Sequence, residues 1–449
     1  MAFYSSKYKH NINTRLLTGQ KGFAAFYITL LIMAVILGIA GSIFISTWGE
    51  QKISGNIVKS SQAYYIAEAG IEDALFRLSK NPEWVRNTGI TYQLKVDEAT
   101  TTVKVSGIIG GSRTITSEGN MKERFRKIEV AYEVSTEKVS FRYGAQVDEG
   151  GMIMHNKSEI QGNIFSNGGI ILSGAAGDKG IVTGGVIVAS TSTTYGNNLI
   201  KGLKIGEDSG ADAFTYSCES CSVGGKLYLS GGTAVDCTAG GGITSSEPVS
   251  KKPLPITQEQ INNWETEASS SEIWAGVEIG IGETQSFGPR KIEGSLRIRN
   301  KGTLIMKGTI WVTGTTTIEN GATVKLDQNS YGSKSGVLIV DNGKIMVENG
   351  AVLEGSGKEG SYLMLLSTNT SQTEDDPAIY VKNNALVAIF YTTMGLITLD
   401  NNTEAREITG YKIIIKPNAV IKYKTGLIDT LFTSGPGGSW KVTSWKEIE

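Results

Sequence analysis

The alternation of apolar and polar positions divides the chain into three stretches. The first, Phe23–Gly49, is 27 residues without a charged side chain, and about 20 apolar residues suffice to cross a bilayer as a helix. Basic residues precede it and no acid occurs before Glu50. This charge asymmetry predicts a single-pass helix with the N-terminus in the cytoplasm and the remainder outside. A cleaved secretory signal is disfavoured, because the apolar run exceeds the usual signal core and no small-x-small cleavage site follows it.

A helical period continues beyond the apolar run. Apolar residues recur at spacings of three and four, which places them in one stripe on a helix: Tyr64, Ala67, Ile71, Ala74, Leu75 and Leu78. Asn81-Pro82 is expected to end this helix, since the residue before proline avoids the helical region. One helix from Phe23 to Leu78 would be roughly 84 Å long at ~1.5 Å per residue. A plain anchor followed by a linker is the alternative on periodicity alone.

The period changes to two after Pro82. Four short alternating segments, "ITYQLKVDE", "TTVKVSGI", "SRTITSEG" and "FRKIEVAYEV", are separated by glycine-rich or charged turns, which is typical of a small antiparallel sheet. We expect residues 83–138 to form this sheet and to bury one face against the helical stripe.

Short strand-like pieces separated by glycines run from 141 to 449. Around residues 296–356, three such pieces total about 20 residues, which fits one turn of a solenoid. Asn-Gly steps begin at 320, 342 and 349 and fit the corners of stacked turns better than hairpins. The predicted fold is therefore mainly β: a long N-terminal helix, a small antiparallel sheet and a right-handed β-helix or solenoid-like body. A sandwich or barrel is the alternative for the body.

One segment interrupts the body at 253–275. It contains a capping-box spacing from Thr257 to Gln260, so a helix over Thr257–Ala268 is expected between turns or over one side. Near the C-terminus, Trp440 and Trp445 are expected to cap the open end of the solenoid, which would otherwise expose unpaired strand edges.

Composition supports a β-rich extracytoplasmic protein. The chain has 56 glycines and only 8 prolines, which suits many short strands with tight turns. Its net charge of −1 argues against a nucleic-acid partner, which usually requires a basic face. The three cysteines, Cys218, Cys221 and Cys237, lack an evident fourth zinc ligand. We expect at least one disulfide among them, because the predicted topology places them outside the cytoplasm.

The N-terminal segments together resemble a known family. A short basic leader, a Gly-Phe junction, an uncharged helix and "QAYYIAEAGIEDALFRL" are similar to type IV prepilins, and most to the PilX-like minor pilins and pseudopilins. The resemblance covers about residues 1–135. It implies cleavage by prepilin peptidase after Gly22, which makes 1–22 a leader, and N-methylation of Phe23. It also implies that the helix over 23–80 packs into a filament core.

One position departs from the pilin pattern. Most pilins carry a glutamate fifth after the cut, where its carboxylate pairs with a neighbour's amino terminus; here that position is Tyr27. An unpaired carboxylate in a bilayer is costly and is normally kept for a function. In lacking this glutamate the chain resembles tip-capping pseudopilins and some minor pilins, so we expect a role at the filament tip or in initiation.

No motif of defined catalytic chemistry occurs in the sequence. Glycan-degrading β-helices need clustered carboxylates, whereas the candidate acids Asp236, Asp327, Asp341 and Asp400 are scattered. Glu374, Asp375 and Asp376 lie together in one turn and are a weak calcium candidate; a solvated turn is the favoured interpretation. We expect no enzyme, no cofactor and no other metal.

These observations predict a filament component of a type IV pilus or a type II secretion-like system. It would act in assembly or tip display and in surface adhesion. The expected partners are other pilins, the assembly machinery, prepilin peptidase, the cytoplasmic membrane through helix 23–49, and a glycan or surface ligand; its final location would be the extracellular filament. The alternative is a membrane-anchored surface β-helix outside any pilus, either structural or glycan-binding or -degrading.

Overall fold

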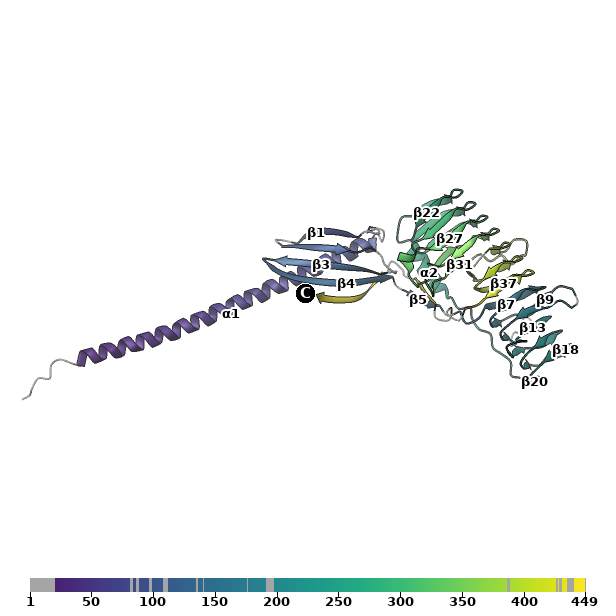
Figure 1. The fold of residues 1–449 in the computed structure, drawn as a ribbon, viewed down its shortest axis with the longest axis horizontal. Coiled ribbons are helices and arrows are strands. Elements are labelled where there is room, and N and C mark those ends of the chain that lie inside the picture. The colour runs from purple at the N-terminus through teal and green to yellow at the C-terminus, as the bar shows by residue number, and fades with distance from the viewer. Residues whose placement is uncertain are drawn as a thin grey trace, which may run out of the picture.

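A long helix leads into a small sheet, and a large β body lies beyond the sheet (Figure 1). The computed structural model describes residues 21–448 except 81–83, 86–88, 97–98, 108–111, 135, 140, 176, 191–197, 386–387, 425–426, 428–429 and 434–439. Helix α1 (Lys21–Lys80) has 60 residues, so it is roughly 90 Å long at ~1.5 Å per residue. It ends next to the predicted stop at Asn81-Pro82, which lies outside the described residues, as does most of the predicted leader.

The C-terminal part of α1 packs on a five-stranded sheet of order β1-β2-β3-β4-β39. All neighbouring strands in it are antiparallel. The strands are β1 (Ile90–Val96), β2 (Ala99–Val105), β3 (Ser112–Met121), β4 (Arg124–Val134) and β39 (Trp440–Ile448). The four strands predicted from alternation are thus confirmed as β1 to β4.

One face of this sheet and the predicted helical stripe make a common core. Ala67, Ile71, Ala74 and Leu78 are buried against strand residues such as Val103 and Val130, while Tyr64 and Leu75 flank them. Alternate residues of β2 are buried and exposed, as expected for a sheet with one covered face. The helical and strand periods therefore meet at a single interface.

The fifth strand corrects the expectation for the C-terminus. We predicted that Trp440 and Trp445 cap the solenoid, but β39 pairs with β4, with Trp440 opposite Val134 and Trp445 opposite Val130. The prediction that 141–449 is all solenoid is therefore wrong at its last strand. Cross-strand pairing with β4 satisfies backbone groups that a terminal cap would leave unpaired.

A two-stranded neck joins the sheet to the body. The chain enters through β5 (Thr136–Val139) and returns through β38 (Thr430–Thr433), and the two strands pair antiparallel. Phe432 is fully buried against Phe141, with ring centroids 6.1 Å apart. The body is thus an insertion between β4 and β39.

The body is a solenoid of parallel strands, as predicted; parallel stacking excludes the hairpin-based alternatives. Leu296 pairs with Thr316 and Thr303 with Thr323, so these turns take 20 residues each. The Asn-Gly steps form corners between stacked turns, where Gly321 N–H donates to Asn349 O. Each turn places inward residues on those of its neighbours, and the interior forms one continuous apolar core.

The turns are not stacked in chain order. The first run begins in the middle of the solenoid and proceeds to one end. Its strands are β6 (Ala145–His155), β7 (Glu159–Gln161), β8 (Ile164–Ser166), β9 (Ile170–Ser173), β10 (Gly180–Val182), β11 (Val186–Val188), β12 (Leu199–Lys201), β13 (Leu203–Ile205), β14 (Ala213–Thr215), β15 (Ser217–Glu219), β16 (Ser222–Val223), β17 (Leu227–Leu229), β18 (Ala234–Val235), β19 (Thr238–Ala239) and β20 (Ile243–Ser245).

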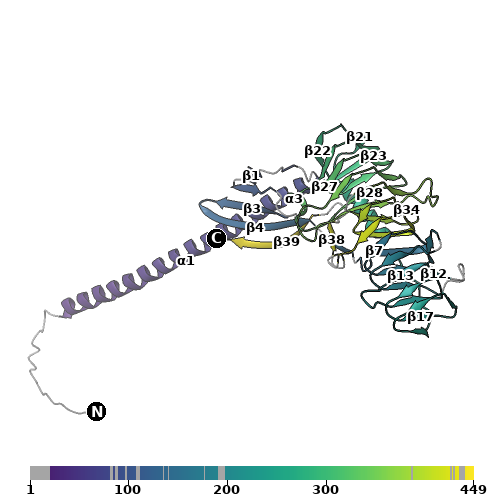
Figure 2. The same cartoon turned by 45° about the vertical axis from the view of Figure 1, so that its right-hand side comes forward.

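The second run starts at the opposite end and returns to the middle, where β36 pairs parallel with β6 (Figure 2). Its strands are β21 (Trp274–Ile279), β22 (Thr284–Phe287), β23 (Arg290–Ile298), β24 (Thr303–Met306), β25 (Ile310–Val312), β26 (Thr316–Ile318), β27 (Thr323–Leu326), β28 (Gly336–Val340), β29 (Ile345–Val347), β30 (Val352–Glu354), β31 (Leu363–Ser367), β32 (Ile379–Val381), β33 (Ile389–Thr392), β34 (Leu396–Leu399), β35 (Glu404–Ala405), β36 (Glu407–Ile415) and β37 (Val420–Lys422). A short helix, α3 (Gln328–Tyr331), lies between β27 and β28.

The segment between the two runs, residues 246–273, crosses one outer face of the solenoid; we call it the strap. It contains α2 (Gln258–Ala268), whose N-cap Thr257 and Gln260 form the predicted capping box. Trp264 and Ile261 of α2 are fully buried. They belong to a second core outside the solenoid interior, with members from β28, β31 and β33. The strap therefore covers an outer face that carries apolar residues instead of polar ones.

Candidate functional site

The N-terminal part of α1 presents an uncovered apolar surface. Its large apolar side chains from Phe23 to Val58 are 50–71% exposed, and an 18-residue window has a mean hydropathy of 2.7. By length and composition this helix can cross a membrane. Such a continuous apolar surface must be covered by lipid or by other protein.

The predicted processing residues lie in the first two turns of α1. Gly22 and Phe23 are both helical, and Phe23 is 66% exposed. Tyr27 lies one turn further along, with its ring centroid 4.8 Å from that of Phe23 in an edge-on contact. We call the exposed part of α1, Phe23–Val58, the stem; it presents aromatic side chains at this end.

The apolar surface of α1 extends beyond the uncharged span. Ile53, Ile57 and Val58 follow Glu50, yet they are 61%, 60% and 54% exposed. Arginines of β4 reach α1 from Asn56 onward, but the first fully buried side chain of the helix is Ala63. About 13 residues, or roughly 20 Å of helix at ~1.5 Å per residue, thus separate Glu50 from the first buried contact with the sheet.

Small residues allow α1 to approach the sheet closely. A Cβ on Gly119 of β3 would lie 2.1 Å from the carbonyl oxygen of Ala63 and 2.7 Å from the amide nitrogen of Ala67. A Cβ on Gly70 would lie 2.3 Å from Ser117 Oγ. Helix and sheet backbones are therefore in direct contact, which fixes the direction in which α1 leaves the sheet. This gives the "AEAG" segment a physical role.

Arg126 of β4 ties the helix to the last strand. Its Nε donates to Ser60 Oγ at 2.6 Å, and its NH1 pairs with Glu447 at 2.8 Å. A groove of about 300 Å³ beside it is lined by Ile57, Tyr64 and other residues of α1 together with Glu447. The chain's last strand thus borders the exposed surface of the stem.

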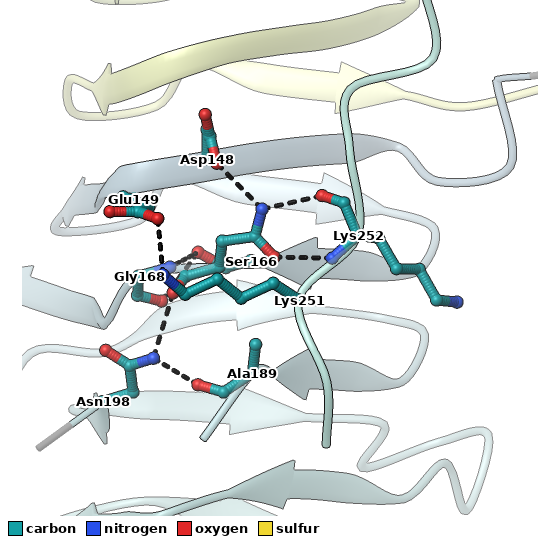
Figure 3. Close-up of polar contacts among 9 residues, drawn as sticks. Asp148, Glu149, Ser166, Gly168, Ala189, Asn198, Lys251 and Lys252 are labelled. Carbon is teal, nitrogen blue, oxygen red and sulfur yellow. Dashed lines mark hydrogen bonds and ion pairs between the residues drawn. The ribbon is translucent and has the colours of Figure 1, made fainter. Parts of the chain in front are cut away.

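The strap is fastened to the first run by polar contacts (Figure 3). Asn167 Nδ2 donates to Lys252 O at 2.7 Å and to Asp148 Oδ1 at 2.8 Å, and Lys252 N–H donates back to Asn167 Oδ1 at 3.0 Å. Lys251 pairs with Glu149. Gln146 Nε2 donates to Pro253 O at 2.8 Å. These contacts, none of which the sequence indicated, hold the strap at the seam where the two runs meet.

The three cysteines meet at one end of the solenoid. Cys218 and Cys237 form a disulfide, and Cys221 is a buried free thiol. The three sulfur atoms lie within 4.8 Å of one another. Burial raises the pKa of the Cys221 thiol. They form the one group of potential metal ligands found among the described residues.

The acidic turn at 374–376 does not gather its carboxylates at one point. Glu374 pairs with Lys416, and Asp376 pairs with Lys344. The hydrogen bond from Lys416 lowers the pKa of Glu374. Lysine partners thus take the carboxylates that a calcium ion would need, and Asp375 remains in the same exposed turn.

The other candidate acids serve local structure. Asp327 caps α3 by accepting from Ser330 N–H, Asp341 accepts from Thr368 Oγ1 at 2.8 Å, and Asp400 accepts from Tyr380 Oη at 3.1 Å. Asp236 occupies a left-handed corner with φ of 52°. His155 lies near the Glu374–Lys416 pair; burial and Lys416 lower its pKa. Among the described residues, no contact joins any two of the aspartates, which are Asp236, Asp327, Asp341 and Asp400.

Two of the solved structures that this chain matches are weakly similar to it. No protein-family model matches the chain, and no curated protein matches its sequence. The competence-associated pilin ComZ from Thermus thermophilus aligns with 10% identity and a TM-score of 0.26 over 87% of this chain and 97% of its own. An ice binding protein from an Antarctic Flavobacteriaceae bacterium aligns with 9% identity and a TM-score of 0.22 over 63% of this chain and 97% of its own. At such TM-scores neither structure indicates the function of this chain.

Proposed function

We propose that this chain is a minor pilin-like filament component that displays its solenoid at the filament tip. The observation that carries the proposal is α1, one helix with an exposed apolar half and a half packed on a small antiparallel sheet. The sequence resemblance to PilX-like prepilins rests on the same helix. Prepilin peptidase would remove residues 1–22 and leave a methylated Phe23 as the new amino terminus.

The exposed isoleucines beyond the uncharged span favour a filament over a plain anchor. A bilayer covers Phe23–Gly49, but Ile53 and Ile57 lie after Glu50 and stay exposed. Neighbouring stem helices would cover them, at about 25 cal/mol per Å² of apolar surface removed from water. This supports contact with other pilin-type helices along the stem.

Tyr27 supports a position at the tip. A subunit inside the shaft would use a carboxylate at this position to pair with the amino terminus of a neighbour, and Tyr27 has no carboxylate. A subunit that starts or ends the filament needs fewer such contacts. The solenoid, inserted between β4 and β39, would then extend beyond the last turn of stems.

The proposal assigns adhesion or display to the body, and no catalysis. The acids considered for glycan hydrolysis engage separate local partners. Repetitive flat faces suit extended ligands such as glycans.

Filaments sheared from cells and labelled with antibody-bound gold test this function. We expect label at filament ends in the wild type and none on filaments from a Gly22→Val strain, whose protein should stay in the membrane fraction. Gly19→Val, a matched leader variant, should label like the wild type. Dense label along the shaft would refute the tip role. Membrane location without filament label in every strain would favour the anchored surface β-helix.

A further inference from the structure

The end turns of the first run place two cysteines directly above one another. Cys218 pairs in register with Ala234, and Ser222 pairs with Thr238. Cys221 and Cys237 are each one residue before the second pair, and Thr238 N–H donates to Cys221 O at 2.9 Å. Cys221 is therefore the stacked neighbour of Cys237, although the disulfide joins Cys237 to Cys218.

Both pairings meet the geometric requirement for a disulfide. The Cα atoms of Cys218 and Cys237 are 6.5 Å apart, and stacked residues of adjacent parallel strands lie about 4.8 Å apart. Disulfides usually span Cα separations of about 4.4–6.8 Å. Cys237 can thus reach either partner across the same corner of the solenoid.

The free thiol is held against the disulfide. Cys221 N–H contacts Cys237 Sγ at 3.4 Å, and the Cys221 thiol donates to the carbonyl oxygens of Glu219 and Ile200 at 3.3 and 3.5 Å. Cys218 and Cys221 are 1% and 3% exposed, whereas Cys237 is half-buried. A thiol from solvent would therefore reach the disulfide at Cys237 first.

We propose that these three cysteines form a disulfide-exchange site in which Cys237 alternates between Cys218 and Cys221, with small-molecule thiols as the class of ligand that reacts there and catalyses the exchange. In the internal step, the Cys221 thiolate attacks Cys237 Sγ, a Cys221–Cys237 bond forms, the Cys218–Cys237 bond breaks, and Cys218 leaves as the thiolate. The proton that Cys221 loses is returned to Cys218. No net oxidation or reduction occurs.

An external thiol catalyses the same change in two steps. It first attacks Cys237, forms a mixed disulfide there and releases Cys218 as a thiol. Cys221 then attacks Cys237 and expels the external thiol unchanged. In either pairing a disulfide tethers the last turns of the first run, and the unpaired thiol is one of the two buried cysteines. Because that buried thiol can attack a mixed disulfide at Cys237, the site removes thiol adducts from its own exposed sulfur. This inference is independent of the proposed filament role.

Peptide mapping of the full chain in detergent micelles tests the exchange. Proteases that cut after lysine and glutamate place each cysteine in a separate peptide, through cuts at Glu219 and Lys226. After incubation with glutathione and acid quenching, we expect both cross-linked pairs, Cys218 with Cys237 and Cys221 with Cys237. Cys218→Ala should form the Cys221–Cys237 bond fully and lose the free thiol. The substitution suits the core, because the stacked position is already Ala234.

Cys221→Ala is the matched control and should show only Cys218–Cys237, also without a free thiol. Detection of Cys218–Cys237 as the sole linkage in glutathione-treated wild type would overturn the proposal. So would two free thiols in Cys218→Ala chains whose solenoid peptides keep wild-type hydrogen-exchange protection. If Cys218→Ala loses that protection, the peptide map of glutathione-treated wild type, which needs no substitution, decides between the two outcomes.

Discussion

The contact between α1 and β3 can be broken by one methyl group. In Gly119→Ala, the new Cβ would lie 2.1 Å from Ala63 O and 2.7 Å from Ala67 N. Both atoms belong to the helix backbone, so no side chain can rotate out of the way. The helix must move away from the sheet by about 1 Å, and a gap of that size forfeits a quarter to a half of the dispersion energy of the atoms it separates.

The expected cost is about 1–3 kcal/mol, the range for overpacking a well-packed interface. A loss of ~2 kcal/mol would lower the unfolding temperature of a domain of this size by roughly 8–16 °C. The backbone of Gly119 is not left-handed, so alanine adds no backbone strain there. The effect would come from the contact alone.

Amide hydrogen exchange of the full chain in detergent micelles measures this effect region by region. We expect faster exchange in peptides covering 63–78 and 112–121, with unchanged solenoid peptides as an internal reference. Gly55→Ala is the matched control, because nothing lies within 4 Å of its Cβ and alanine favours helix by up to ~1 kcal/mol. Unchanged protection of 63–78 in Gly119→Ala would refute the close-contact account.

Three further predictions concern other parts of the fold. Glu407 is fully buried, its Oε2 has no described hydrogen-bond partner, and burial raises its pKa well above the ordinary value. The free energy of unfolding that the protonated carboxyl supports should therefore be retained below about pH 4.5 and fall by ~1.4 kcal/mol per pH unit as pH rises toward the raised pKa. Chemical denaturation of Glu407→Gln should show a flatter pH dependence in that window. Ending the chain after Thr433 removes the eight register pairs of β39 with β4, at ~0.2–1 kcal/mol each, so exchange in β4 should rise while solenoid peptides stay protected; an unchanged β4 would contradict the five-stranded sheet. Trp264→Ala empties a fully buried site under the strap and should cost about 3–5 kcal/mol, seen as proteolysis within 246–273 that Glu259→Ala, on an exposed face of α2, does not show.

The local spacing of apolar residues predicted most of the architecture. Residues at spacings of three and four predicted the stripe from Tyr64 to Leu78, and alternation predicted β1 to β4, because both signals arise from burial of one face. The solenoid followed from short strands and glycine corners, and the strap helix from its capping box at Thr257 and Gln260. Each of these signals lies within a few residues along the chain.

The pairing of strands far apart along the chain could not be predicted from the sequence. Strand β39 resembles any alternating strand, and nothing in "WKVTSWKEI" states that its partner is β4, some 300 residues earlier. The order of the turns escaped for the same reason, since β36 stacks on β6 through apolar residues found on every turn. The unusual apolar outer positions of β28 and β31, Val337, Ile339, Met364 and Leu366, were the signal that a strap covers that face.

The candidate site residues divide in the same way into those predicted from local sequence and those whose contacts come from distant parts of the chain. Phe23 and Tyr27 could be singled out because the Gly-Phe junction and the helix that follows it resemble a prepilin. The cysteines could be named but not paired, because pairing depends on which residues stack at a solenoid corner. The acids at 374–376 looked like one cluster, yet lysines from distant turns, Lys344 and Lys416, separate them.

The mature amino terminus tests the central claim most directly. Mass spectrometry of the protein isolated from a host with prepilin peptidase should find the chain beginning at N-methylated Phe23, the residue that would start a filament stem. A chain that retains Met1, or that is cut at another position, would contradict the pilin-type stem and leave α1 as an anchor of a surface β-solenoid.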